Sequence, residues 1–88
     1  MASSYTSERR AHLQGLAEVL PRHGLVSRMV GEEEPLLWVW HPHTSRQTLV
    51  FATPSERGWL FLWAPGGTGG ADDLDRTARA LRETLGSA

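Results

Sequence analysis

The fold is decided by residues 25–64, which read LVSRMVGEEEPLLWVWHPHTSRQTLVFATPSERGWLFLWA. This stretch contains four short apolar segments that are separated by Gly- and Pro-containing links. Leu, aromatic and β-branched residues dominate each segment, which is the composition of a β-strand. The links are about five or six residues long, which suits antiparallel neighbours and is too short for a crossover helix. We therefore expect four strands in a meander, at Leu25–Val30, Leu36–His41, Thr48–Ala52 and Trp59–Ala64.

A helical pattern precedes the strands. Its apolar residues recur at i, i+3, i+4 and i+7, which places them on one side of a helix. These residues are Leu13, Leu16, Ala17 and Leu20. Thr6 or Ser7 can cap the start of this helix, and Pro21 and Gly24 are expected to end it.

A second helix is expected after the strands, from Asp72 to Leu85. Its first turn is acidic and Gly86 follows it, as is typical of a helix that begins and ends at these points. Residues 65–71 are rich in glycine and are predicted to be a flexible connector. The apolar side of this helix consists of Leu74, Ala78, Leu81 and Leu85.

These elements predict an α+β fold in one domain of 88 residues. A four-stranded antiparallel meander would carry the N- and C-terminal helices on one face. Residues 1–6 are expected to form a flexible N-terminus. A chain of this length is too short for a Rossmann fold or a barrel enzyme.

Charge and composition exclude several classes of partner. The formal net charge is −1, with 9 basic and 10 acidic residues, so no positive surface for nucleic acid or an anionic membrane is expected. The chain has no Cys, which excludes disulfides and thiolate ligands. No apolar leader or membrane-length apolar run occurs, and we expect a cytoplasmic protein.

The arrangement resembles a group of small actinobacterial proteins of unassigned activity. The features that carry the resemblance are Pro35–Pro42 (PLLWVWHP), Trp59–Trp63 (WLFLW) and the acidic start of the helix at 72–85. The resemblance covers most of the chain, about residues 7–85. It implies an α-β-β-β-β-α order, and it implies no activity or site residue.

No motif for catalysis or for a cofactor stands out. The sequence has no Gly-x-Ser-x-Gly motif, and the glycines at 66–70 lack the Gly-Lys-Ser/Thr of a phosphate-binding loop. His41-Pro42-His43 places two imidazoles at a strand end, but a solvated turn explains them better than a metal site. We therefore expect no enzyme activity, no cofactor and no metal.

The predicted sheet has more apolar surface than its helices can cover. Strands at 36–41 and 59–64 are apolar on both alternating sides, and two helices of about 10 Å diameter cover one face of such a sheet only. The helices suit an aliphatic face of Leu37, Val39, Val50, Leu60 and Leu62, which would leave an aromatic face open. In the alternative arrangement the aromatic face lies beneath the helices. The aromatic face, our candidate interaction surface, consists of Trp38, Trp40, Phe51, Trp59, Phe61 and Trp63.

An open apolar face of this size indicates a partner, because monomers rarely expose apolar patches of more than a few hundred Å². The sequence therefore predicts a non-enzymatic protein-interaction domain that associates as a homodimer or with another protein. A domain that binds a small apolar ligand on the same face is the alternative.

Overall fold

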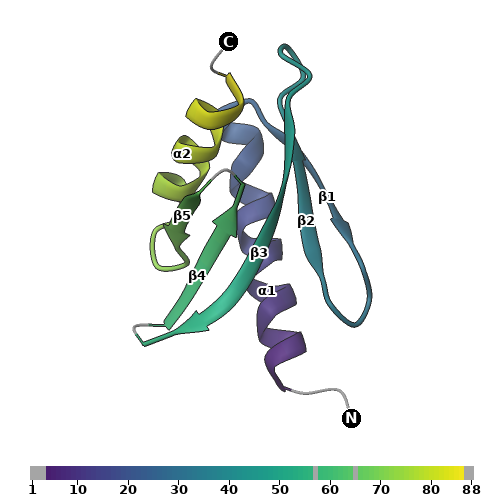
Figure 1. Cartoon of the computed structure of the whole chain (residues 1–88), viewed down its shortest axis with the longest axis vertical. Coiled ribbons are helices and arrows are strands. Elements are labelled where there is room, and N and C mark those ends of the chain that lie inside the picture. Colours follow the sequence, from purple (N-terminus) through teal and green to yellow (C-terminus); the bar gives the residue numbers. More distant parts are fainter. Residues whose placement is uncertain (1–3, 57, 65, 87–88) are drawn as a thin grey trace.

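The computed structural model describes residues 4–56, 58–64 and 66–86. Within these residues a helix and a short 3-10 helix precede five strands, and a second helix follows them (Figure 1). The elements are α1 (Ser4–Val19), η1 (Leu20–His23), β1 (Val26–Val30), β2 (Leu36–Trp40), β3 (Gln47–Ser55), β4 (Gly58–Trp63), β5 (Gly67–Gly70) and α2 (Leu74–Gly86).

The strands form one antiparallel sheet in the order β1-β2-β3-β4-β5. Each strand pairs with the strand before it along the chain, so the sheet is a meander. The predicted α+β class and antiparallel meander are confirmed. The central strand, β3, is also the longest, and it continues through Pro54 to Ser55, three residues beyond the expected end.

The fifth strand corrects the expected count of four. β5 lies inside the glycine-rich segment at 65–71 that was predicted to be a connector, although residue 65 itself is outside the described residues. Glycine is depleted from strands because it contributes no side chain to the sheet. Here the missing side chains are what allow the packing, since a Cβ at Gly67 would overlap the Trp63 indole and one at Gly69 would overlap Thr77.

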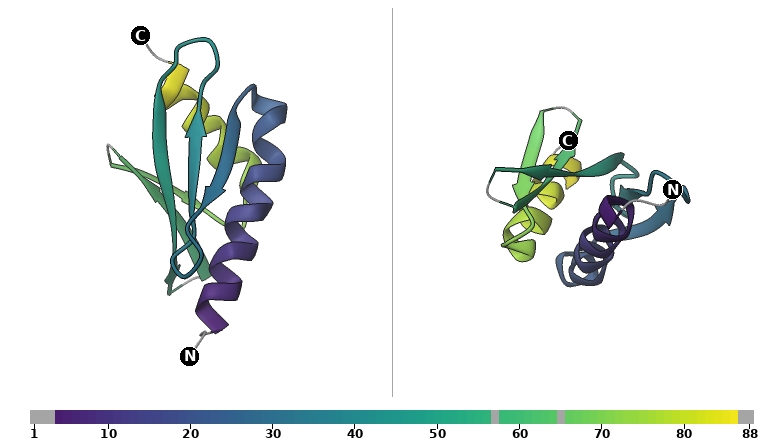
Figure 2. Two further views of the ribbon diagram at one scale, coloured as in Figure 1. Left: turned by 90° about the vertical axis from the view of Figure 1, so that its right-hand side faces the viewer. Right: turned by 90° about the horizontal axis from the view of Figure 1, so that it is seen from below.

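Both helices lie on the same side of the sheet (Figure 2), and α1 crosses behind β3 in the view of Figure 1. The core fills the space between the helices and this face of the sheet. Leu81 of α2 and Leu13 and Leu16 of α1 are completely buried there. The sheet contributes Leu37, Val39, Val50, Ala52, Phe61 and Trp63 to the same cluster.

The first helix begins earlier than predicted and ends as predicted. It starts at Ser4, so Thr6 and Ser7 lie within its first turn and do not precede it; residues 1–3 are outside the described part of the chain. Its continuation η1 is followed by the C-cap residue Gly24, whose φ of 75° is the left-handed conformation that favours glycine. The Gly24 N–H donates to the carbonyl of Pro21 at 3.1 Å and so satisfies a carbonyl at the helix end.

One of the acidic residues that precede α2, Asp73, caps this helix, which begins two residues later than the predicted start at Asp72. The helix begins at Leu74, and the carboxylate of Asp73 accepts the backbone N–H of Arg76 at 3.1 Å. The buried hydroxyl of Thr77 donates to the carbonyl of Gly70 at 3.0 Å, which ties the first turn of α2 to the end of β5.

Candidate interaction surface

Strand register decides which side chains share a face of the sheet. Val50 on β3 pairs with Leu37 of β2 and with Trp63 of β4, and all three are buried beneath the helices. Residues one position along each strand therefore point to the opposite side, away from the helices. We call this side the open face. It presents Val26, Arg28, Val30, Leu36, Trp38, Trp40, Gln47, Leu49, Phe51, Thr53, Leu60, Leu62, Thr68 and Gly70.

The large apolar side chains that the described residues expose all lie on the open face. Val26 is 40% exposed, Leu49 42%, Phe51 49% and Leu62 37%. Phe51 and Leu49 stand on β3, in the middle of the sheet, where folded monomers usually place covered apolar residues. This position separates them from scattered surface hydrophobics, which need no explanation.

Two tryptophans extend the apolar surface across β2. The rings of Trp38 and Trp40 lie on the same side of the strand with centroids 5.0 Å apart, and both side chains are half-buried. The indole N–H of Trp38 donates to the side-chain oxygen of Gln47 at 2.8 Å. Because this hydrogen bond lies within the chain, a partner could cover the Trp38 ring without leaving its N–H unpaired.

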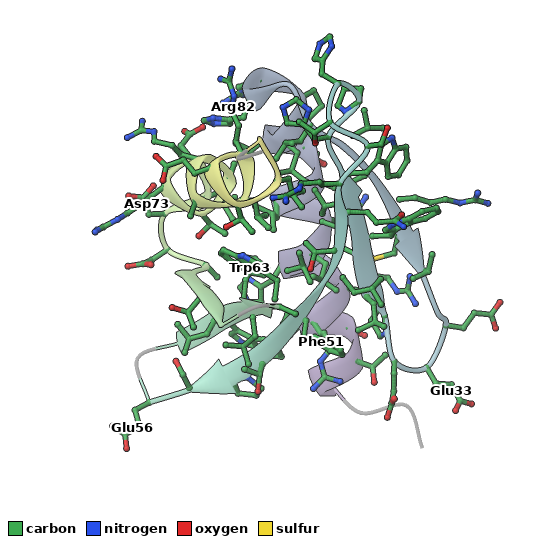
Figure 3. The ribbon with its side chains drawn as sticks, turned by 45° about the horizontal axis from the view of Figure 1, so that its top comes forward. Glu33, Phe51, Glu56, Trp63, Asp73 and Arg82 are labelled. Carbon is green, nitrogen blue, oxygen red and sulfur yellow. The ribbon has the colours of Figure 1, made fainter. Side chains whose placement is uncertain are left out.

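The predicted set of six aromatic residues is divided between the two faces. Trp38, Trp40 and Phe51 lie together on the open face, as expected. Phe61 and Trp63 belong to the core, and their exposed fractions are 0% and 4%, so their assignment to the interaction surface is wrong. Figure 3 shows Trp63 between the sheet and α2, whereas Phe51 lies on β3.

The assignment of Trp59 to the interaction surface is also wrong. It points to the helix side of β4, where its ring is 4.9 Å from the ring of His12 and 6.0 Å below the guanidinium of Arg9. It packs against the core from the margin and takes no part in the open face.

The physical reason for the division is the even number of residues in the two hairpin loops that flank β3, six between β2 and β3 and two between β3 and β4. An even loop makes odd-numbered residues of one strand share a face with even-numbered residues of the next. Two such hairpins, with pairs Leu37–Val50 and Val50–Trp63, give β2 and β4 the same parity again. The even-numbered tryptophans of β2 therefore share their face with Leu60 and Leu62, which were expected beneath the helices.

Leu49, Leu62 and Val26 are exposed on the open face but were not among the predicted members of the interaction surface. The loop between β3 and β4 holds two residues, since Ser55 pairs with Gly58. This loop length was the feature that could have indicated which residues of β4 share a face with Leu49. A two-residue hairpin fixes the register of its strands.

The charge of the open face is confined to its edge. Arg28 stands on β1, an edge strand, and is exposed. The other members of the face carry no formal charge. Glu34 and Arg9, which are not members of the face, line a hollow together with Leu36 and Phe51. A covering partner would thus meet uncharged side chains around Leu49, and charged groups at Arg28 and beside Phe51.

An open groove crosses the same face. Its volume is about 450 Å³, and it lies between the tryptophan strand and the central strand. The residues that line it are Val30, Trp38, Gln47, Thr48 and Leu49.

The His41 side chain, at the start of the β2–β3 loop, has a structural role. Nδ1 of His41 accepts the backbone N–H groups of His43 at 3.1 Å and Thr44 at 3.3 Å, so this ring organises the turn. In the described part of the chain, no three His, Cys, Asp or Glu side chains gather as a metal site would require.

None of the helices formed by the described residues has the combination of length and apolar character that would carry it across a membrane. Comparisons of the chain with family models, with curated proteins and with solved structures give no match. The geometry of the open face is therefore the basis for a functional assignment.

Proposed function

We propose that this chain is a non-enzymatic protein-interaction domain that forms a homodimer through the open face of its sheet. The observation that carries the proposal is the exposure of Leu49 and Phe51 at the centre of a sheet face that neither of the two long helices of the described residues covers. Burial of apolar surface is the main favourable term in protein association.

The size of the open face supports a second copy as the partner. Five strands about 4.8 Å apart and five residues with a rise of about 3.3 Å give a face of about 24 by 17 Å, or about 400 Å² in projection. Side-chain relief makes the accessible area larger than the projection. Two copies in contact would therefore bury close to the roughly 1,000 Å² in total that a specific interface needs.

The position of the exposed side chains supports two-fold symmetry. A dimer of identical faces uses the same patch on both copies, and its axis lies in the plane between the sheets. Any such axis through the middle of the face passes close to Leu49 and Phe51, because β3 is the central strand. The two most exposed of the large apolar residues would then pack against the same pair of residues on the other copy.

The face also fits the polarity of an interface. Aromatic anchors and a centre without charge are typical of interface cores, with charged residues at the rim. Phe51 and the Trp38–Trp40 pair supply the anchors, and Arg28 lies at the rim.

The substitution Leu49→Glu tests this proposal against the matched control Ala11→Glu. Leu49 is 42% exposed within one chain and Ala11 is exposed on α1, so both variants should retain the far-ultraviolet circular dichroism of the wild type. A carboxylate at Leu49 cannot be desolvated cheaply in an interface. Sedimentation velocity should give a dimer for the wild type and for Ala11→Glu, and a monomer for Leu49→Glu.

Two results would overturn the proposal. One is a wild type that remains a monomer at concentrations of tens of micromolar. The other is a folded Leu49→Glu variant that dimerises as tightly as Ala11→Glu.

A small apolar ligand is the second candidate for the same face, and the groove beside Trp38 favours it. A volume of about 450 Å³ lies within the range of roughly 300–1,000 Å³ that is typical of ligand sites. Titration with anilinonaphthalene sulfonate separates the two functions. A ligand-binding monomer should bind the probe saturably with one molecule per chain, whereas a dimer should exclude the probe as the protein concentration rises.

A further inference from the structure

The side chains of the open face are larger on one side of the sheet than on the other. Its β2 side carries the neighbouring rings of Trp38 and Trp40, which are tilted by 45° relative to each other. Its β5 side carries Thr68 and Gly70, whose side chains are much smaller than an indole ring. The face is thus high on the β1–β2 side and low on the β5 side, with Phe51 between them.

Two sheets pack face to face at about 10 Å, and the side chains of both faces fill that space. Dense packing requires that large residues of one layer stand opposite small residues of the other. If β2 of one chain lay over β2 of the other, four indoles would crowd one side of the interface. The glycine and threonine of the two β5 strands would then leave a gap on the other side. If β2 lies over β4 of the partner, each pair of indoles packs against Leu60 and Leu62 and not against two further indoles, and β1 lies over the smaller residues of β5.

We infer that the two-fold axis runs along β3, so that the tryptophan strand of each copy packs over the β4–β5 side of the other. This inference rests on the proposed homodimer and specifies how its two faces meet. In this arrangement β1 of one copy lies over β5 of the other. In the opposite arrangement the axis runs across the strands, and β1 lies over β1.

Arg28 and Thr68 report directly on the arrangement. Both are exposed, and they lie on opposite edge strands. Arg28 aligns across the sheet with Leu49, and Thr68 aligns with Phe51, so the two residues are offset by two positions along the strand direction. With the axis along β3, Arg28 of one copy and Thr68 of the other are about 12 Å apart, whereas each residue is about 22 Å from its own counterpart. With the axis across the strands, these two separations are exchanged.

The absence of Cys from the chain makes the test direct. The variants Arg28→Cys and Thr68→Cys are treated under reducing conditions with a bismaleimide whose reach is about 12 Å, each alone and as an equimolar mixture. Glu18→Cys, at an exposed site on α1, is the control for random collision, and sedimentation and circular dichroism establish that each variant is folded and dimeric.

The inference predicts a covalent dimer in the mixture at several times the yield of either variant alone, with one chain of each kind. Covalent dimers of Arg28→Cys alone and of Thr68→Cys alone, at yields above that of the mixed product, would overturn the arrangement and leave the homodimer in place. Dimers in sedimentation that give no covalent product above the Glu18→Cys control would also overturn it. Variants and wild type that sediment as monomers would instead refute the proposed homodimer.

Discussion

Replacement of Phe51 by Ala should weaken dimerisation about a hundredfold or more and leave the fold intact. Phe51 is 49% exposed in one chain, and an aromatic side chain has roughly 150–250 Å² to bury, so each copy offers about 75–120 Å². Both copies of Phe51 lie in a symmetric interface, so the area buried on association is twice this value. At about 25 cal/mol per Å², the pair of side chains contributes about 4–6 kcal/mol, of which Ala keeps a minor part. A loss of about 3 kcal/mol corresponds to a factor of about 100 in Kd.

Sedimentation equilibrium over a concentration series measures this Kd, and circular dichroism checks the fold. Phe51→Leu is the matched control, because Leu retains most of the apolar volume and should change Kd by less than about tenfold. Arg22→Ala, at an exposed site on η1, should change nothing. A folded Phe51→Ala variant with the Kd of the wild type would refute the placement of the interface on the open face.

Three further substitutions test the packing beneath the helices. Leu81→Ala should lower the free energy of unfolding by about 2–5 kcal/mol, and Tm by at least about 10 °C, because Leu81 is completely buried between α2 and the sheet. Gly69→Ala should destabilise by about 1–3 kcal/mol in a urea titration, because the new Cβ would overlap Thr77. Trp63→Glu should abolish the folded circular dichroism signal by burying an unpaired charge, whereas Trp40→Glu should give a folded monomer.

The controls and contrary outcomes for these substitutions are specific to each site. Arg82→Ala, next to Leu81 on the exposed side of α2, should leave Tm nearly unchanged, and an equal loss in both variants would contradict the assigned apolar side of α2. Gly15→Ala meets only Leu74 at 3.4 Å and should be neutral or stabilising; a Gly69→Ala variant that behaves in the same way would contradict the close approach of β5 to α2. A folded Trp63→Glu variant would contradict the division of the aromatic residues between the two faces.

The class of the fold could be predicted from the sequence because the local signals agree with the tertiary structure. Gly31 and Pro35 separate β1 from β2, the two helices have distinct apolar sides, and an acidic residue, Asp73, caps α2. Such agreement between local preference and global packing makes an element predictable.

The fifth strand could not be predicted in this way. The run Gly67–Gly70 has the composition of a loop, and its strand conformation depends on Trp63 and Thr77, which lie against it from β4 and α2. That dependence is tertiary, and no local pattern expresses it.

The sequence was sufficient to predict an open apolar face on the sheet, but not all of the residues that form it. Both sides of Leu36–Trp40 and of Trp59–Trp63 are apolar, so alternation within either segment does not say which side faces the helices. The answer depends on the register of two hairpins, and a change of one residue in either loop would exchange the faces of β4. Trp38, Trp40 and Phe51 were assigned correctly to one face, while Phe61 and Trp63 joined the core because both loops are even.

The most direct test of an interface on the open face is an isotope-filtered nuclear Overhauser experiment on a mixture of labelled and unlabelled chains. This experiment detects only proton contacts between different copies. The homodimer proposed here predicts such contacts from the Phe51 ring and the Leu49 methyl groups, which stand on the central strand. Contacts that arise only from the exposed surfaces of α1 and α2, or no contacts at concentrations of hundreds of micromolar, would contradict it.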